Sequence, residues 1–350
     1  MALMFQTLSD FLAHGHDTVI DVRSPAEYAE DHVPGAINLP VLDNAERAEV
    51  GTIYVQQSPF LARKIGAAMV FRNAADHIEH RLSHHEGSWK PLVYCWRGGQ
   101  RSGSFTWMLS QIGWRAEVVK GGYQSYRRLV HQVMYEAPLA HRLMLLDGLT
   151  GTAKTEILKQ VAEMGGQVLD LEGFAGHRGS LLGEMPGGQP SQKRFESYIA
   201  CALAQMDPAR PVLVEAEASK IGARILPPSL WDAMKAAPRI DLEVPFAARC
   251  AYLLEAYDDI LSNAEALREK LGLLREHRSG AVVDAWFELI AAGDKPALVA
   301  RLMADHYDPA YRKARSRYEV SDQRKVALTG LDEAARKQAA QRILELLDAS

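Results

Sequence analysis

Two stretches of this chain place a short apolar strand directly before a glycine-containing loop and a helical segment. The first strand, 91–94, ends at Cys95, and the second, 143–147, ends at Gly148. Strand, loop and helix in this order form the repeating unit of a parallel α/β sheet, and glycine lets the connecting backbone approach a ligand closely. Shorter strand-like stretches recur at 18–23, 36–39, 115–119, 167–171 and 211–215.

The chain divides into two sheet patterns and a helical remainder. Its 350 residues are long for one domain and comfortable for two. The first pattern ends before 132–141, and a second begins at Arg142. We therefore expect one α/β domain at 1–135, a second at 136–245, and a helical C-terminal part, 246–350, packed on the second domain.

Composition excludes several classes of protein. Apolar residues make up 47% and charged residues 24%, and no apolar run approaches the roughly 18 residues that span a bilayer. The first ten residues lack the basic start and apolar core of a signal peptide, so we expect a cytoplasmic protein with no membrane partner. Because the net charge is −4, any RNA binding needs a local basic surface.

The cysteines are too few for a disulfide framework. Only Cys95, Cys201 and Cys250 occur, with no CxxC pair, so we expect neither a disulfide nor a metal site. Cys201 and Cys250 lie in apolar patterns and are predicted to belong to the core.

Cys95 begins a loop with the features of an anion site. The loop, Cys-Trp-Arg-Gly-Gly-Gln-Arg-Ser, runs into a helix N-terminus, where backbone N–H groups can surround an anion. This setting favours a thiolate, and Arg97 and Arg101 add positive charge. A free cysteine is usually a small core hydrophobe, but two arginines and two glycines are poor core material. We predict that Cys95, Arg97 and Arg101 are catalytic.

The second glycine loop is close to a phosphate-binding P-loop. The pattern G-x-x-x-x-G-K-[ST] holds except that Ala153 replaces the second glycine. Gly151 supplies part of the lost flexibility, and the departure weakens nucleotide hydrolysis more than diphosphate binding. The predicted phosphate-binding residues are Gly148, Gly151, Thr152, Lys154 and Thr155. The strand at 211–215 ends in carboxylates, Glu215 and Glu217.

Basic side chains elsewhere suit a diphosphate or an RNA backbone. Several of them are predicted to lie near the phosphate loop. Separately, the segment 307–318 interleaves basic and aromatic residues in a way that suits RNA. Solvated charges and an ordinary charged helix face are the competing explanations. The substrate or RNA candidates are His177, Arg178, Lys220, Arg224, Arg312 and Arg315.

Longer motifs resemble known families. The stretches 21–28 and 32–40 resemble the N-terminal signature of rhodanese domains, in which the cysteine at the position of Cys95 carries a persulfide. Fusion to a P-loop is unusual, and the stretches 46–54, 171–180 and 214–222 are similar to the tRNA 2-selenouridine synthase family. The resemblance spans residues 21–222 and is weaker in the C-terminal third. It implies a rhodanese-like parallel-sheet domain followed by a P-loop NTPase-like α/β domain.

The resemblance also implies an activity. The family converts wobble 2-thiouridine of tRNAs for lysine, glutamate and glutamine into 2-selenouridine, by geranylation of the sulfur and replacement with selenium. Cys95 would carry the selenium, and the P-loop would hold the diphosphate. The co-substrates would be geranyl diphosphate and selenophosphate, with no tightly bound cofactor. A Mg²⁺ requirement and contact with an enzyme that supplies selenophosphate are left open.

Three other functions stay open from the residues alone. Rhodanese-like phosphatases share the Cys-x5-Arg spacing and would cleave aryl phosphates without tRNA. A sulfurtransferase with a regulatory nucleotide-binding domain would use thiosulfate and hydrolyse a nucleotide. A non-enzymatic sulfur carrier or RNA-binding module would turn nothing over.

Overall fold

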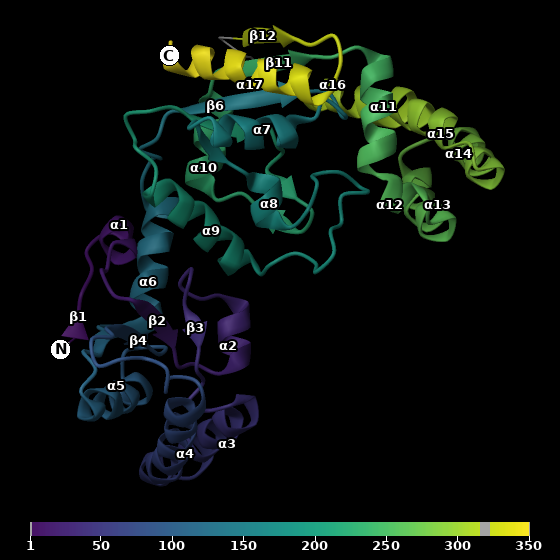
Figure 1. Ribbon diagram of the computed structural model, residues 1–350. Coiled ribbons are helices and arrows are strands. Elements are labelled where there is room, and N and C mark those ends of the chain that lie inside the picture. The colour runs from purple at the N-terminus through teal and green to yellow at the C-terminus, as the bar shows by residue number, and fades with distance from the viewer. Residues whose placement is uncertain (1, 316–322, 350) are drawn as a thin grey trace. The chain divides into compact units, whose positions relative to one another are not determined.

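The chain folds into two compact units (Figure 1). The computed structural model describes residues 2–315 and 323–349. Unit 1 comprises Met1–Ala137 with Pro190–Gln205, and unit 2 comprises Pro138–Gln189 with Met206–Ser350. The predicted boundary after residue 135 does not anticipate that 190–205 joins unit 1. Arg317 and Tyr318, part of the basic aromatic segment, lie outside the described residues.

Unit 1 contains a five-stranded parallel sheet in the order β1-β5-β4-β2-β3. Its strands are β1 (Ala2–Leu3), β2 (Thr18–Asp21), β3 (Ile37–Asn38), β4 (Pro91–Tyr94) and β5 (Glu117–Val119). Its helices are α1 (Leu8–Leu12), α2 (Pro25–Glu30), α3 (Asn44–Gln56), α4 (Pro59–His80), α5 (Gln100–Ile112), α6 (Gly122–His131), η1 (Gln132–Glu136) and α9 (Gln192–Ala204). The central strand β4 is buried throughout, which its uninterrupted apolar sequence predicts.

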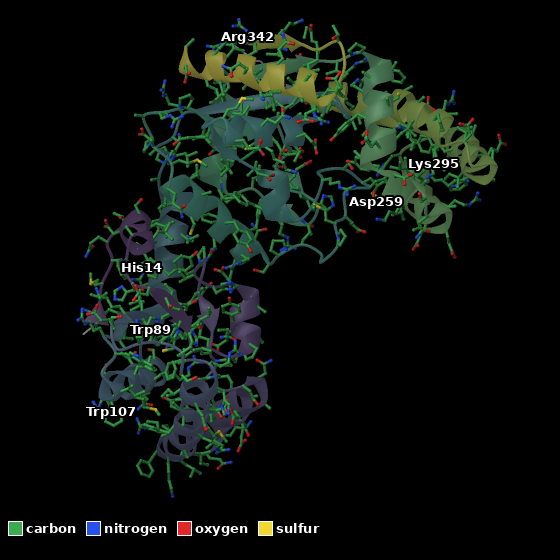
Figure 2. The ribbon with its side chains drawn as sticks, viewed as in Figure 1. His14, Trp89, Trp107, Asp259, Lys295 and Arg342 are labelled. Carbon is green, nitrogen blue, oxygen red and sulfur yellow. The ribbon has the colours of Figure 1, made fainter. Side chains whose placement is uncertain are left out.

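The core of unit 1 lies around β4 and its neighbours. Val93 and Cys95 pack there with Phe105 and Leu109 of α5. Trp89, labelled in Figure 2, meets Trp114 edge to face at 5.1 Å between ring centroids. The indole N–H of Trp89 also donates to the Thr18 hydroxyl at 3.0 Å, which satisfies a buried donor.

Helix α9 joins unit 1 through buried polar groups. The Asp31 carboxylate accepts hydrogen bonds from the hydroxyls of Ser197 and Tyr123, both at 2.8 Å. Burial raises the pKa of Asp31. Because Ser197 lies on α9, the Asp31 carboxylate ties that helix to the unit that contains β4.

Unit 2 contains a second five-stranded parallel sheet, in the order β12-β11-β6-β8-β7. Its strands are β6 (Leu143–Gly148), β7 (Gln167–Leu169), β8 (Val212–Glu215), β11 (Arg239–Glu243) and β12 (Gln323–Ala327), beside a hairpin of β9 (Lys220–Ile221) and β10 (Arg224–Ile225). The carboxyl ends of parallel strands share one edge, so the residues after β6, β7 and β8 meet there.

Among its described residues, the predicted C-terminal part is helical except for β12, which pairs with β11. The helices of unit 2 are α7 (Lys154–Glu163), α8 (Leu171–Ala175), α10 (Pro228–Ala236), α11 (Phe246–Ala256), α12 (Asp258–Leu261), α13 (Ala264–Gly272), η2 (Leu273–Glu276), α14 (Gly280–Ala292), α15 (Lys295–Leu302), η3 (Met303–Tyr307), α16 (Asp308–Arg315) and α17 (Glu333–Asp348). Helix α17 contacts α7, and Figure 1 shows its yellow ribbon along the edge of unit 2. Within the described residues, no helix is long and apolar enough to cross a membrane.

Candidate functional site

Cys95 lies directly after the central strand of unit 1, and its side chain is buried, with 3% exposed. The Ser102 hydroxyl, in the first turn of α5, donates a hydrogen bond to its Sγ at 3.1 Å. The carbonyl oxygen of Cys95 accepts from the N–H of Tyr123 at 2.8 Å. A Cβ at Gly122, whose φ is +58°, would lie 2.2 Å from that oxygen, so only glycine fits. The loop is therefore closed tightly around the thiol.

The two arginines of the cysteine loop differ in their contacts. Arg101 donates to the Glu27 carboxylate from Nη1 at 2.8 Å and from Nη2 at 3.4 Å. Burial alone would raise the pKa of Glu27, but this guanidinium lowers it below its usual range. Arg97 is exposed and has no ion pair among the described residues. The thiol loop thus has one engaged cation and one that can meet a ligand.

A buried cation that the sequence did not single out lies beside the same loop. Arg23, only 1% exposed, forms a bidentate pair with Asp21, with its closest N–O distance at 2.6 Å. Its guanidinium carbon lies 4.0 Å from the ring centroid of Tyr123 and 5.9 Å from that of Trp96. This aromatic packing fixes residues that contact the backbone of the cysteine loop.

The P-loop in unit 2 runs from the end of β6 to the start of α7, as its sequence pattern predicts. Ala153, at the place of the usual glycine, has φ 56° and ψ 36°, a left-handed conformation. The loop therefore keeps its shape without glycine, at a cost of about 1–2 kcal/mol. Gly151 has a φ of +83°, and a Cβ there would lie 2.9 Å from the Leu253 side chain. Glycine is therefore required at position 151.

The polar side chains of the P-loop are engaged within unit 2. The Lys154 ammonium donates to the Gly148 carbonyl at 2.9 Å. The Thr155 hydroxyl lies 3.1 Å from a carboxylate oxygen of Glu172 and 3.1 Å from one of Glu215. The hydroxyl is hence held by residues that follow β7 and end β8.

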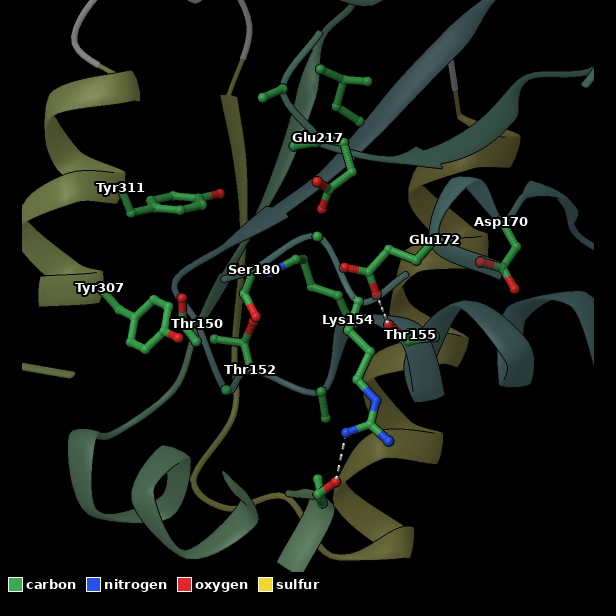
Figure 3. A pocket seen from close by; sticks show the side chains of 18 of the residues that line it. Thr150, Thr152, Lys154, Thr155, Asp170, Glu172, Ser180, Glu217, Tyr307 and Tyr311 are labelled. Atoms are coloured by element: carbon green, nitrogen blue, oxygen red, sulfur yellow. Dashed lines mark hydrogen bonds between the residues drawn. The ribbon is translucent and has the colours of Figure 1, made fainter. Parts of the chain in front are cut away.

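A cavity of about 870 Å³ opens beside the P-loop, and polar, apolar and aromatic side chains line it (Figure 3). Of the predicted phosphate-binding residues, Gly151, Thr152, Lys154 and Thr155 line it, whereas Gly148 does not. The larger apolar side chains of the lining are Leu145, Leu181, Met185, Trp231, Met234 and Leu253, and the phenols are Tyr252, Tyr257, Tyr307 and Tyr311. A phosphate loop therefore shares one cavity with hydrophobic and aromatic side chains.

Three carboxylates gather at the other side of the P-loop lysine. Burial and the neighbouring Glu217 raise the pKa of Glu172 to about 7. Burial and the Glu172 carboxylate raise the pKa of Glu215 well above its usual range, and burial also raises that of Glu217. A Cβ at Gly179 would lie 2.7 Å from Glu172 and 2.8 Å from Glu217, so these two carboxylates converge on the glycine. The described residues contain no cluster of three or more side chains arranged to hold a metal ion.

The basic candidates separate into two groups. Arg178 and Arg315 line the cavity; Arg178 lies 3.5 Å from Asp259, and Arg315 lies 3.4 Å from Asp147. The other four candidates do not line this cavity. His177 is buried, and burial lowers its pKa. Lys220 and Arg224 belong to the β9–β10 hairpin, and Arg312 lines a separate cavity of about 470 Å³.

Sequence reasoning missed several residues of the cavity. Tyr311 belongs to the segment with a composition that suits RNA, and its hydroxyl donates to Asp147 beside the P-loop. Arg239 donates to the same carboxylate at 3.1 Å, because β11 pairs with β6 in parallel. Tyr252 and Tyr257 come from α11 and the residue after it. Strand order brings Arg239 to this site and helix packing brings the tyrosines, and the sequence reveals neither.

Comparisons with known proteins cover both units. Residues 141–278 match the family described as tRNA 2-selenouridine synthase AAA domain, and residues 5–129 match the rhodanese-like domain. A tRNA 2-selenouridine synthase of Alcanivorax borkumensis is 34% identical, covering 84% of this chain and 88% of that protein. One of Shewanella loihica is 31% identical over 86% and 87%, and one of Cupriavidus pinatubonensis is 33% identical over 83% and 76%.

Proposed function

Because this chain belongs to the tRNA 2-selenouridine synthase family, we propose that it replaces the sulfur of tRNA 2-thiouridine with selenium through a geranylated intermediate. The tRNA-modifying selenium transfer follows from the family. The geranyl step, the use of geranyl diphosphate and selenophosphate, and the choice of tRNAs for lysine, glutamate and glutamine are the proposal's finer parts.

The observation that carries the geranyl step is the mixed polar and apolar lining of the cavity of unit 2. Lys154 and the backbone N–H groups at the start of α7 suit a diphosphate. Leu181, Met185 and Trp231 are apolar side chains that line the same cavity, which suits a hydrocarbon tail. A ligand with a diphosphate at one end and an isoprenoid at the other would use both kinds of lining.

The carrier role of Cys95 is supported by its loop. Ser102 donates to the sulfur, which stabilises a thiolate or a selenium bound to it. The exposed Arg97 can neutralise the negative charge of an incoming selenophosphate. Arg101 is directed at Glu27 by two hydrogen bonds, which disfavours the phosphatase alternative, since a Cys-x5-Arg phosphatase needs that guanidinium for its substrate.

The chemical roles then divide between two sets of residues. Lys154 and the P-loop N–H groups hold the diphosphate and stabilise the charge that develops on it as its bond to the geranyl group breaks. The thiouridine sulfur takes the geranyl group, which makes it a better leaving group. Selenium from selenophosphate, held at Cys95, then attacks carbon 2 of the base. The bond from carbon 2 to sulfur breaks, geranylthiol leaves, and water cleaves the selenium–phosphorus bond to release phosphate. A Mg²⁺ requirement stays a prediction.

Nucleoside mass spectrometry tests the proposal. A 2-thiouridine tRNA is incubated without oxygen with the protein, geranyl diphosphate and selenophosphate, beside Cys95→Ala. We expect selenouridine with the wild-type protein and only geranylated thiouridine with the variant. Unchanged thiouridine in every reaction would contradict the proposal, and aryl phosphate, thiosulfate and nucleotide assays would then decide among the other functions.

A further inference from the structure

We propose that the tyrosines beside the P-loop stabilise an allylic carbocation, so that the geranyl group leaves its diphosphate before sulfur attacks. This inference rests on the proposed function and deepens it. It assigns the cavity of unit 2 to allylic diphosphates and gives Tyr257, Tyr307 and Tyr311 a catalytic role that is distinct from binding the hydrocarbon tail.

Three aromatic rings line the cavity that the P-loop also lines. Tyr257 follows α11, Tyr307 ends η3 and Tyr311 lies on α16, and all three line the cavity together with Lys154. Figure 3 shows Tyr307 and Tyr311 on one side of the P-loop and Glu172 on the other. Segments from separate parts of unit 2 thus bring their rings to the loop that suits a diphosphate.

These ring faces already lie close to positive charge. The Lys154 ammonium nitrogen is 5.9 Å from the ring centroid of Tyr311, and the guanidinium carbon of Arg178 is 5.0 Å from that of Tyr257. An aromatic face attracts a cation within about 6 Å of its centroid. Burial raises the pKa of Tyr257 and of Tyr307, so both phenols stay neutral near physiological pH.

Distance along the ligand distinguishes an allylic diphosphate from a nucleotide. Carbon 1 of geranyl diphosphate is bonded directly to a phosphate oxygen, so it must lie near any group that holds that phosphate. In a nucleotide, the ribose separates the base from the phosphates. Because Tyr311 lies within 5.9 Å of the Lys154 ammonium, its ring fits the reacting carbon better than a base.

The step balances without any further reactant. The bond between carbon 1 and the phosphate oxygen breaks, and diphosphate leaves with both electrons. The positive charge spreads over carbons 1 and 3 of the allylic group, beside the rings. The thiouridine sulfur then donates an electron pair to carbon 1, and N3 of the base releases its proton to water. Stabilisation that exists only while the cation exists raises the rate without tightening substrate binding.

A fluorinated substrate tests the order of the bond changes. Fluorine at carbon 2 of geranyl diphosphate withdraws electrons from the cation but changes its size little. We expect single-turnover geranyl transfer to thiouridine tRNA, measured by mass spectrometry without selenophosphate, to slow by more than about tenfold with the analogue. Equal rates for the two substrates would overturn the inference, because a direct attack by sulfur does not need the cation.

Paired variants test the rings. Tyr307→Leu and Tyr311→Leu keep apolar bulk but remove the aromatic face, whereas Tyr307→Phe and Tyr311→Phe keep the ring. We expect each leucine variant to lose on the order of tenfold in transfer rate and more than its phenylalanine partner. Calorimetry without tRNA should give geranyl diphosphate affinities within about threefold of the wild type for the leucine variants. The exposed Tyr54 of unit 1 supplies a control, Tyr54→Leu, with wild-type rates.

The outcomes separate this inference from the function on which it rests. No geranylated product from the wild-type protein would defeat the proposed function itself. Normal transfer with leucine variants as fast as wild type would defeat only the carbocation role. A loss of geranyl diphosphate affinity that matches the loss of rate would mean that the rings bind the substrate and do no more, which also overturns it. Tight ATP binding that competes with geranyl diphosphate and is lost in the leucine variants would also overturn the inference. The rings would then stack on a nucleotide base.

Discussion

The Lys154 ammonium donates a hydrogen bond to the carbonyl oxygen of Gly148 at 2.9 Å, which folds the lysine back across its own loop. A diphosphate offers oxygens with more negative charge than this carbonyl, so Lys154 can exchange the internal acceptor for the ligand. The same ammonium lies over the face of Tyr311, on the other side of the loop from Glu172.

Removal of this ammonium should abolish geranyl transfer. We expect Lys154→Met to lose at least about a hundredfold in transfer rate, because the developing negative charge on diphosphate loses its cation. The measurement is single-turnover geranylation of thiouridine tRNA. Lys337→Met, on an exposed position of α17, serves as the control. Wild-type geranylation by the Lys154 variant would remove the P-loop from the reaction.

The left-handed Ala153 predicts an unusual response to glycine. Because its φ of 56° strains any residue with a Cβ, Ala153→Gly should stabilise unit 2 by about 1 kcal/mol. The same change at Ala162, exposed within α7, should instead destabilise by about 1 kcal/mol. Urea unfolding of the two variants compares them directly. Equal shifts of the same sign would show that the conformation at Ala153 carries no strain.

Glu172 predicts how stability depends on pH. Its pKa is about 7 in the folded protein, against a usual value of 4.5, so the folded state binds more protons between these values. Its contribution therefore favours folding below the usual value and is lost as pH rises to about 7. We expect Glu172→Gln to match wild-type stability near pH 4.5 and to exceed it by about 3 kcal/mol above about pH 7.

Urea unfolding at several pH values measures that difference. Glu163→Gln, at an exposed position of α7, is the matched control and should show no such trend. A Glu172→Gln advantage that stays constant with pH would contradict the raised pKa. It would point to the removal of a steric or hydrogen-bonding defect.

The sequence predicted the elements that local patterns specify. The strands before Cys95 and Gly148, the P-loop, and the two α/β patterns are confirmed, because each depends on residues that are adjacent in the chain. The relatives confirm the family resemblance that the longer motifs indicated.

Contacts between distant segments could not be predicted in the same way. Arg239 reaches Asp147 only because β11 lies next to β6, and no local pattern encodes that order. Ser197 belongs to unit 1, where its hydroxyl donates a hydrogen bond to the buried Asp31, 166 positions away in the chain. Tyr311 belongs to a segment whose composition suits RNA. Its position beside Asp147 depends on the packing of α16 near the P-loop, which no local pattern encodes.

Changes at Cys95 and changes in the P-loop should affect different products of the reaction. We expect Cys95→Ser to keep geranyl transfer but to form no selenouridine, because the thiol is needed only to carry selenium. Nucleoside mass spectrometry with both co-substrates separates the two products. Cys250→Ala, at a partly exposed cysteine of unit 2, should make both products normally. Normal amounts of selenouridine from Cys95→Ser would exclude the carrier role.

A buried ion pair ties α16 to the P-loop. Arg249 donates to both oxygens of Asp308 at 2.9 Å and to the Thr150 carbonyl at 3.0 Å. We expect Asp308→Ala to destabilise unit 2 by about 3–5 kcal/mol, because it leaves the buried Arg249 charge without its partner. The double variant Arg249→Met, Asp308→Leu should recover much of that loss in urea unfolding, since it removes both charges. It should still transfer geranyl slowly, because Thr150 and Tyr311 lose the contact that positions them. A double variant as unstable as Asp308→Ala would mean that packing, not the unpaired charge, sets the cost.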